Sequence, residues 1–403
     1  MTNILIAIVV ILSIAALVQI LRVSELLSEI KNKDVNEVTD EDNNTQGVLF
    51  LIVGFGFLIF VIWQIVAWDH LLLPQASSVH GAQIDLLMKT SMGLILVVFF
   101  ILSPMLFYFV YKYRGKKSNK AYFFSHHNKL EVIWTVVPTI ILTGLIIFGL
   151  KTWDKAMNIE VSSSTKIIEI YAKQFDWTAR YAGQDKKLGK TDFRFVESGS
   201  NPLGLVNNKY LKVAIKDKQK KYEELSKNPL EKDDYGRTNQ EKMDVLSRHI
   251  DQLPGILNEI GTDVLAQSND DIITREIHLV VNEPVLLKFR SQDVIHSAFL
   301  PYFRVQMNCV PGMSTQFGFT PTKTTEEMRK DPKVIKQMKE INRDRLAKGE
   351  NEVEFDYVLL CNKICGENHY DMQMKFVVET KDQFNDWMEE EQEKSKNMLT
   401  QKL

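Results

Sequence analysis

Cysteine is scarce in this sequence, which contains three among 403 residues. A disulfide scaffold uses many more cysteines in a much shorter chain, so that class of protein is excluded. An excess of one charge is also missing, because 49 basic residues stand against 51 acidic ones and the formal net charge is −2. This balance excludes a generally basic nucleic-acid binder, and we expect no nucleic-acid partner. A hydrophobic content of 45% argues against a disordered chain.

Charged side chains are almost absent from four apolar stretches within the first 150 positions. Each stretch has about 18–21 residues, enough for a helix to cross a hydrocarbon core of roughly 30 Å. A helix on the surface of a soluble domain carries a polar stripe, which these stretches lack. We therefore predict about four transmembrane helices, at roughly Ile4–Leu21, Val48–Trp68, Ser91–Tyr111 and Val132–Leu150. In domain terms these are an extra N-terminal helix at 1–22, a helix at 48–68 and a helical hairpin at 91–150.

The first stretch resembles a signal peptide in length only. No basic residue precedes it and no small-x-small cleavage site follows it, which favours a retained helix. Basic residues concentrate between the third and fourth stretches, whereas Lys89 alone lies between the second and third. The positive-inside rule then places the first and third connections in the cytoplasm. Both termini, and everything after about residue 155, are predicted to lie outside.

The second half of the sequence reads as short strands separated by turn signals, which is typical of a small β-sandwich or β-barrel. We assign this extracytoplasmic domain to residues 160–388, so the whole chain is predicted to be α+β. Two charged, helical segments at about 206–270 and 324–349 read as insertions. Their charges fit either solvated helix faces or a docking surface for a partner subunit. Residues 382–403 are predicted to form an exposed helix.

A cluster of metal-ligating side chains lies between two predicted strands, in the segment from Cys361 to Met372. It contains two thiols, one imidazole and one thioether within twelve positions, contributed by Cys361, Cys365, His369 and Met372. Soft sulfur ligands combined with imidazole select copper. Two thiolates in one loop could be shared by two ions, and such a site needs a second imidazole. His296 is the best candidate, because it follows a predicted strand and precedes a loop.

Other interpretations of this cluster are weaker. A lone Cys-x-x-x-Cys pair in an exported domain is usually a disulfide or a helix-turn pair, but that does not explain the histidine and methionine. A zinc site needs four ligands and no methionine. A c-type haem requires Cys-x-x-Cys-His, which the sequence lacks. Cys309, the third cysteine, is predicted to be a small buried hydrophobic residue.

The loop resembles the copper A loop of cytochrome c oxidase subunit II. The resemblance covers roughly residues 45–180, 270–322 and 352–388, and it is specific because five motifs occur in the family's order. They are Glu131-Val-Ile-Trp134-Thr-Val-Val-Pro138, Gln174-Phe-Asp-Trp177, Asp293-Val-Ile-His296-Ser, Val310-Pro311-Gly312 and the loop Cys361–Met372.

The resemblance implies a cupredoxin-like Greek-key β-barrel outside the membrane, with a dinuclear copper A centre. In such a centre Cys361 and Cys365 bridge two coppers. The remaining ligands it implies are His296, His369, Met372 and the backbone carbonyl of Lys363. The implied function is to pass single electrons from a c-type cytochrome to the haem of subunit I. Oxygen is reduced to water there, coupled to proton translocation.

The resemblance also implies a membrane location for the chain and a role in proton transfer for one of its residues. The chain would lie in the cell inner membrane or plasma membrane, assembled with subunit I and other oxidase subunits. Glu131 matches the carboxylate at the entrance of a proton path. A carboxylate at the membrane interface is a functional candidate on physical grounds as well. The alternative is a solvated interfacial glutamate.

Several positions depart from the family pattern. Lys363 stands where the family usually has a glutamate that also binds magnesium, and an ammonium cannot ligate a cation, so magnesium is doubtful. Phe175 stands where the family has the tryptophan that receives electrons, while Trp177 matches the second tryptophan. Both remain candidates for electron entry. The extra helices and insertions suggest a permanently docked cytochrome complex as the donor.

Three other functions are less consistent with the sequence. A membrane-anchored copper chaperone does not need the histidine and methionine of the loop. Quinol oxidase subunits of the same fold lack the copper ligands. Nitrous oxide reductase shares the loop but not the membrane helices.

Overall fold

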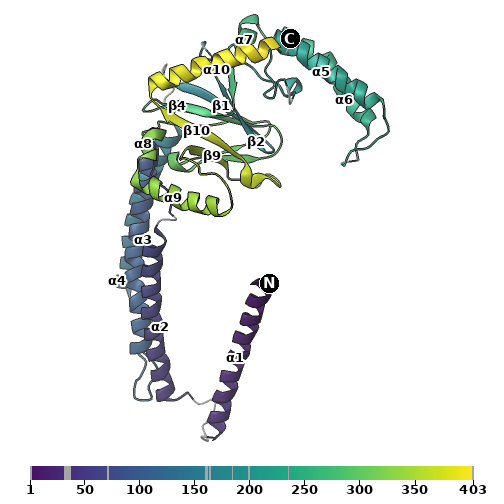
Figure 1. The fold of residues 1–403 in the computed structure, drawn as a ribbon. Helices are drawn as coiled ribbons and strands as arrows, with labels where there is room; N and C mark the ends of the chain where they lie inside the picture. Colours follow the sequence, from purple (N-terminus) through teal and green to yellow (C-terminus); the bar gives the residue numbers. More distant parts are fainter. Residues whose placement is uncertain are drawn as a thin grey trace. The chain divides into compact units, whose positions relative to one another are not determined.

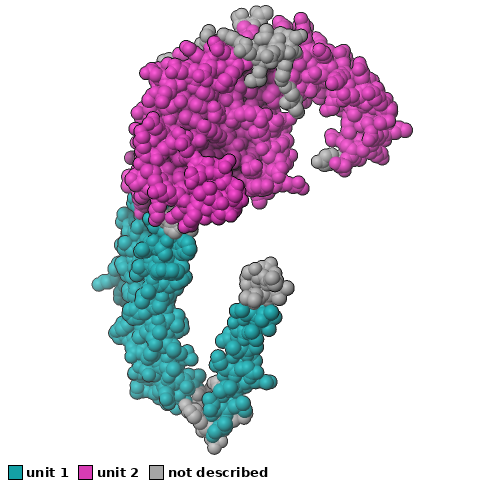
Figure 2. Space-filling view, in the orientation of Figure 1, with its two compact units in different colours: residues 1–72, 90–141 teal, residues 73–89, 142–403 magenta. Residues whose placement is uncertain are grey.

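A computed structural model describes residues 2–401, apart from 31–37, 70–71, 159–161, 163–164, 184, 198–199 and 235. The chain divides into two compact units, each described by itself below (Figure 2). Unit 1 comprises residues 1–72 and 90–141. Unit 2 comprises residues 73–89 and 142–403.

The four predicted apolar stretches are helices that are long and apolar enough to cross a membrane. Each is longer than its apolar stretch: α1 (Thr2–Ile30), α2 (Asp40–Ala67), α3 (Val79–Lys112) and α4 (Asn128–Met157). Polar residues extend them. In α2, Thr39 caps the N-terminus and forms a capping box with Asp42, so the helix begins eight residues before Val48, where the apolar stretch starts.

Close contact between α2 and α3 within unit 1 depends on a small residue. Gly54 lies against the ring of Phe107, and a Cβ at this position would come within 2.3 Å of that ring. Small residues let transmembrane helices approach closely, which compensates for the absence of a hydrophobic driving force in lipid. Phe57 and Phe99 add an edge-to-face ring contact with centroids 6.1 Å apart.

Two five-stranded sheets form the body of unit 2 (Figure 1). The first has the order β3-β2-β1-β5-β8 and the second the order β4-β10-β9-β6-β7. The first contains β1 (Lys166–Lys173), β2 (Asp176–Tyr181), β3 (Ile272–Thr274), β5 (Val285–Ser291) and β8 (Thr315–Phe319). The second contains β4 (Ile277–Val280), β6 (His296–Leu300), β7 (Val305–Cys309), β9 (Tyr357–Cys361) and β10 (Gln373–Glu379). The α+β class is thus confirmed.

Both sheets contribute to one hydrophobic core. Ile168 and Ile170 of β1 point into it, as do Leu359 of β9 and Phe376 of β10. The pair β1–β5 and the pair β4–β10 are parallel, whereas the other neighbours are antiparallel. The parallel pairs bring strand ends that are distant in sequence to the same edge of the sandwich.

The first insertion is longer than predicted, because it fills the chain between β2 and β3, residues 182–271. It contains a short 3-10 turn η2 (Phe193–Phe195) and the helices α5 (Asn208–Ser226), α6 (Asn239–Glu259) and α7 (Thr262–Ala266). Helices α5 and α6 pair side by side, in teal in Figure 1. The prediction rests on charged segments of helical composition, and residues 182–205, whose described part contains only the short η2, lack that composition.

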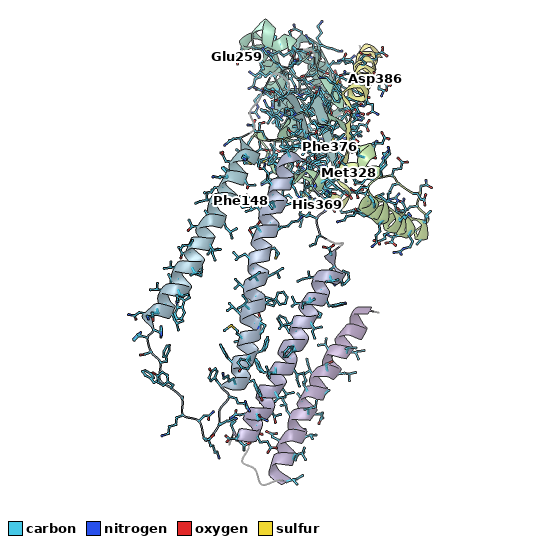
Figure 3. All side chains as sticks on the ribbon, turned by 90° about the vertical axis from the view of Figure 1, so that its left-hand side faces the viewer. Phe148, Glu259, Met328, His369, Phe376 and Asp386 are labelled. Carbon is cyan, nitrogen blue, oxygen red and sulfur yellow. The ribbon has the colours of Figure 1, made fainter. Side chains whose placement is uncertain are left out.

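The second insertion fills residues 320–356 and contains α8 (Thr325–Arg329) and α9 (Pro332–Ala347). Met328 of α8 enters the main core, near Phe376 of β10 (Figure 3). The segment before α8 is hydrogen-bonded to the segment before α3, since Thr322 N–H donates to Ser77 O and Val79 N–H to Thr320 O. The second insertion is therefore packed at its base.

The first turns of α3 are tied to the β-sandwich within unit 2. Arg304 pairs with Asp85 at 2.8 Å and donates to the carbonyl oxygen of Pro74. His80 lies against the rings of Phe317 and Phe319 and is buried. This explains why α3 begins well before its apolar stretch.

The prediction of an exposed C-terminal helix is wrong for the first half of α10 (Lys381–Gln401). Phe384 is buried against Tyr181, and Trp387 stacks on His278 with ring centroids 4.0 Å apart. Apolar residues at positions 384, 387 and 388 lie on one face, which is the spacing of a packed helix. The many glutamates of this segment hid that stripe from the sequence interpretation.

A buried ionic network joins the first insertion to the outer face of the first sheet. Arg180 of β2 pairs with Glu169 of β1 at 2.7 Å and with Asp271 at 2.8 Å, and it donates to Gly189 O at 2.8 Å. Arg290 pairs with the same Glu169 at 2.6 Å. All three partners around Arg180 are buried. Removing one member of such a network leaves an uncompensated charge in a dry place.

Substituting Arg180→Met should therefore lower the free energy of unfolding by about 3–5 kcal/mol, because Asp271 loses its cation. Denaturant unfolding of the full chain in detergent, followed by tryptophan fluorescence, measures this. Arg275→Met is the matched control, since its pair with Asp176 involves a side chain that is 80% exposed. It should cost less than about 1 kcal/mol. Equal losses in the two variants would contradict the role given to the network.

Candidate metal centre

Three strand ends and one loop meet at one edge of the sandwich. His296 begins β6 and Cys361 ends β9, and these antiparallel strands pair Ala298 with Cys361. Beyond β9 the chain turns through the loop 361–372 and returns as β10, with Cys361 N–H donating to Met372 O at 3.1 Å. His296 and Cys361 project from the face of β6 and β9 that also carries the core residues. The cluster therefore lies at the edge of the hydrophobic core.

The predicted ligands form a row in which each contacts the next. His296 Nδ1 lies 3.8 Å from Cys361 Sγ, which lies 3.8 Å from Cys365 Sγ. Cys365 Sγ in turn lies 3.5 Å from His369 Nδ1 and 3.8 Å from Met372 Sδ. The carbonyl oxygen of Lys363 lies 3.3 Å from Cys361 Sγ. The structure thus brings all six predicted groups together.

The distances fit metal binding. Donor atoms that share an ion in tetrahedral directions at roughly 2.0–2.3 Å lie about 3.3–3.8 Å apart. Among the described residues, the ligating atoms of His296, Cys361 and Cys365 all lie within 4.8 Å of one another. The donor set of two thiols, two imidazoles and one thioether is soft and suits copper.

The cluster is largely dry. His296 and Met372 have almost no exposed surface, and Cys365 is buried as well. Burial, reinforced by the neighbouring Cys361, raises the pKa of the Cys365 thiol to about 11. A bound cation has the opposite effect and favours the thiolate. An ion at this place therefore offsets an electrostatic cost that burial imposes on the thiols.

His296 is oriented by a carboxylate. Its Nε2 lies 2.9 Å from Asp293 Oδ1, and Asp293 Oδ2 accepts a hydrogen bond from the backbone N–H of Gln174 at 2.7 Å. Burial alone would raise the pKa of Asp293, but the hydrogen bonds from Gln174 and His296 hold it below its usual value. An ionised carboxylate only accepts, so the proton sits on Nε2 and the lone pair of Nδ1 faces the thiols.

The segment that follows β1 also contacts and supports the ligand loop. Gln174 Nε2 donates to Cys365 O at 2.5 Å. The half-buried ring of Phe175 lies against Gly366, where a Cβ would come within 2.6 Å of that ring. Gly366 has φ +145°, a conformation that favours glycine. Phe175 therefore contacts the loop directly.

Trp177 is completely buried behind the cluster. Its indole N–H donates to Met372 O at 3.4 Å, and its ring meets that of His296 edge-on with centroids 6.1 Å apart. A protein docked on this surface would not touch Trp177, because the side chain has no exposed area. Of the two candidates for electron entry, only Phe175 has surface to offer.

Three further predicted residues have clear positions. The side chain of Lys363 is exposed, while its carbonyl faces Cys361. Cys309 is buried, and burial raises the pKa of its thiol to about 12, which confirms the prediction of a small buried residue. Glu131, in the first turn of α4, accepts a hydrogen bond from His127 N–H at 3.2 Å.

The sequence interpretation missed the supporting residues Asp293 and Gln174. Both occur inside motifs that carry the resemblance, but the sequence alone indicates no role for them. A signal existed for Asp293, which lies three residues before a predicted histidine ligand. Gln174 has no such signal, because its two contacts bring together residues more than 100 positions apart.

The chain is similar in sequence to several known proteins of one kind. Residues 66–152 match the family described as cytochrome C oxidase subunit II, transmembrane domain. The alternative cytochrome c oxidase subunit 2 of Bradyrhizobium diazoefficiens is 22% identical over 344 residues, which cover 85% of this chain and 91% of the relative. Cytochrome c oxidase subunit 2 of Synechocystis is 20% identical over 343 residues, 85% of this chain and 81% of the relative.

Solved structures give a weaker match. The periplasmic domain of subunit II of the cytochrome oxidase of Bradyrhizobium japonicum is 15% identical, with a TM-score of 0.27. The match covers 58% of this chain and 99% of that domain. The matches to the two sequence relatives, by contrast, span most of both chains.

Substituting Asp293→Asn should weaken copper binding by about 10–100-fold, as expected when the partner of a ligating histidine is lost. The amide nitrogen of asparagine cannot accept, so either His296 or Gln174 loses its acceptor. Competition with a copper chelator measures the affinity. Glu367→Gln is the control, because it removes one exposed carboxylate from the same loop. An equal loss in the control would assign the effect to charge rather than orientation.

Proposed function

Because the chain is a subunit II-type protein of cytochrome c oxidase, we propose that it is the electron-input subunit of a respiratory haem–copper oxidase. In this proposal the edge of the sandwich holds a dinuclear copper A centre. The observation that carries it is the continuous row of donors from His296 through the two thiols to His369. A site for a single ion would not need an imidazole at each end of a thiol pair.

Each predicted ligand then has a role in holding the ions. Cys361 and Cys365 would hold both ions, and His296 and His369 would each hold one. Met372 and the carbonyl of Lys363 complete the set. When bound, the copper pair supplies one-electron oxidation and reduction. The chain's own residues keep the ligands in place and exclude water, so the surroundings rearrange little when the charge changes.

Rigidity follows from how the ligands are attached. His296 and Cys361 belong to paired strands, and Met372 lies where β10 resumes the sheet. Asp293 fixes His296, the one ligand that comes from a different part of the chain. Gln174 fixes the loop that carries the other ligands. Functional groups on sheet ends are held more firmly than groups on free loops.

The surface over the loop fits a protein partner. Ile364 and Tyr370 are 86% and 85% exposed and flank the ligands. Exposed apolar side chains beside a redox centre mark a contact surface. We propose that a c-type cytochrome, or a docked cytochrome-bearing complex, delivers electrons at this end, with Phe175 as the aromatic contact. Electrons leave for the haem of subunit I, where oxygen is reduced to water with proton translocation.

The remaining assignments concern the membrane. The four helices lie in the inner or plasma membrane with the β-domain on the extracytoplasmic side, as the distribution of basic residues supports. Glu131 at the start of α4 is the candidate entrance of a proton path. Magnesium is not expected at position 363, because the exposed ammonium of Lys363 cannot ligate it.

Electron paramagnetic resonance of the copper-loaded full chain tests the central proposal. The expected signal is a hyperfine pattern from one electron shared equally by two copper nuclei. Cys361→Ser and Cys365→Ser should each abolish it, since a hydroxyl is a poor bridge between coppers. Met372→Leu should retain copper and shift its reduction potential. Cys309→Ser, a change at the buried non-ligand thiol, is the control. An unchanged signal in Cys361→Ser would contradict the ligand assignment.

The nature of the donor gives a separate prediction. Mild solubilisation of membranes should co-purify the oxidase with a cytochrome-bearing complex, because the sequence encodes no fused haem-binding motif and carries large insertions. Electron transfer from the co-purified complex should exceed that from added soluble cytochrome c. Full activity with soluble cytochrome c alone would argue against a permanently docked donor.

A further inference from the structure

A second concave site lies at the end of the sandwich opposite the metal centre. It is a cavity of about 370 Å³ between the first turns of α10 and the sheet. Lys166 begins β1 at this end, whereas the other end of β1 leads to Gln174 and the ligand loop. The walls come from Lys166 and Ile167, from the chain after β2 and from α10. None of the residues that line it belongs to α1–α4 or to the predicted ligands.

The lining carries an excess of positive charge. Lys166, Lys186 and Lys381 all line the cavity, against the single carboxylate of Glu283. Glu283 is already paired with Lys381 at 3.1 Å. Among the described residues, no carboxylate lies within ion-pair distance of Lys166 or Lys186. Three ammonium groups against one carboxylate leave a net charge of about +2 at neutral pH.

These charges are close enough to affect one another. Burial lowers the pKa of Lys166. Glu283 works against this, whereas the ammonium groups of Lys381 and Lys186 lower it further. The folded chain thus holds two exposed ammonium groups near the partly buried Lys166, and an anion would relieve their repulsion.

The lining of the cavity also includes apolar side chains. Ile272, Phe384 and Met388 contribute to it, and the ammonium of Lys166 lies over the ring of Phe384 at 4.1 Å from its centroid. A cavity of this size lies near the lower end of the range for small-ligand pockets, roughly 300–1,000 Å³. The site therefore suits a small ligand with one strongly charged group and one apolar part.

We propose that this cavity binds the phosphate group of a small organic phosphate or of a phospholipid headgroup. A phosphate monoester carries about −1.5 to −2 charges at pH 7, which matches the excess of the lining. Lysines bind phosphate as point charges. A bound phosphate would link Lys166 of β1 and Lys186 to Lys381 at the start of α10. It would thereby hold α10 on the sheet at the end remote from the metal centre.

Titration of the full chain in uncharged detergent, at fixed ionic strength, tests the site. Inorganic phosphate and phenyl phosphate are the probes, and isothermal calorimetry gives the dissociation constants. Phenyl phosphate should bind more tightly than inorganic phosphate, because its ring can contact the apolar side chains of the lining. Hydrogen exchange of residues 381–392 should slow when phenyl phosphate is added, since α10 is then held at two points.

The double variant Lys166→Gln/Lys186→Gln should bind phenyl phosphate at least tenfold more weakly. Lys187→Gln is the matched control, because Lys187 is exposed next to the site but does not line it. Without ligand, the double variant should unfold at the same temperature as the parent or higher, since two repelling charges are gone. A purely structural role for these lysines would instead lower that temperature.

A second arm separates the two sources of phosphate. The full chain is placed in nanodiscs of anionic phospholipid or of phosphatidylcholine, without soluble phosphate. Protection of residues 381–392 only in the anionic nanodiscs assigns the site to a lipid headgroup, and protection only by phenyl phosphate assigns it to a soluble ligand. Binding that is equal in the parent and the double variant, or no binding of either probe at millimolar concentration, would overturn the proposal.

Discussion

The position of β9 between β6 and β10 is the constraint on which the metal centre depends. Pairing of Ala298 with Cys361 brings His296 to one side of the thiols, and pairing of β9 with β10 brings Met372 to the other. A slip of one residue in either pairing would turn a ligand to the opposite face. The register is well specified because the same faces of these strands carry the core: Tyr357 and Leu359 are buried on the side from which Cys361 projects. The core residues and the predicted ligands thus lie on the same face of these strands, and packing of the core positions the ligands.

Support from the first sheet turns this face into a dry and rigid centre. Asp293 and Gln174 lie together because β1 and β5 are parallel, so the two chain segments that leave these strands start at the same edge. One carboxylate there sets the tautomer of His296, and one amide holds the loop through Cys365 O. Trp177 closes the rear of the cluster. Each of these contacts comes from a residue that is not itself a predicted ligand. They explain why a loop of twelve residues needs a domain with two sheets to hold it.

Much of this arrangement could be predicted from the sequence, because its strongest signals are local. The apolar stretches of α1 to α4 and the spacing from Cys361 to Met372 are visible without any tertiary contact. The sequence predicts His296 at the end of a strand, before a loop; this placement is wrong, because His296 begins β6, but the residue still lies beside Cys361. What the sequence could not give depends on distant partners. Residues 182–205 lack the helical composition that predicts an insertion, and one of the buried partners of Arg180 is Asp271, 91 positions later. The apolar stripe of α10 was masked by its charges, although Phe384 is buried.

Burial of the donors restricts where a partner can approach. His296, Cys365 and Met372 offer almost no surface, so a partner must approach across the exposed part of the loop, beside Ile364 and Tyr370. Phe175 lies against Gly366 in that loop and keeps some exposed area, whereas Trp177 does not. Phe175 therefore lies where it could contact an electron donor, although it lacks the indole of a tryptophan. Apolar contact is weakly selective, so charged segments elsewhere are needed to choose the partner. In the proposed function, the two insertions, which are rich in lysine and glutamate, are candidates for this role.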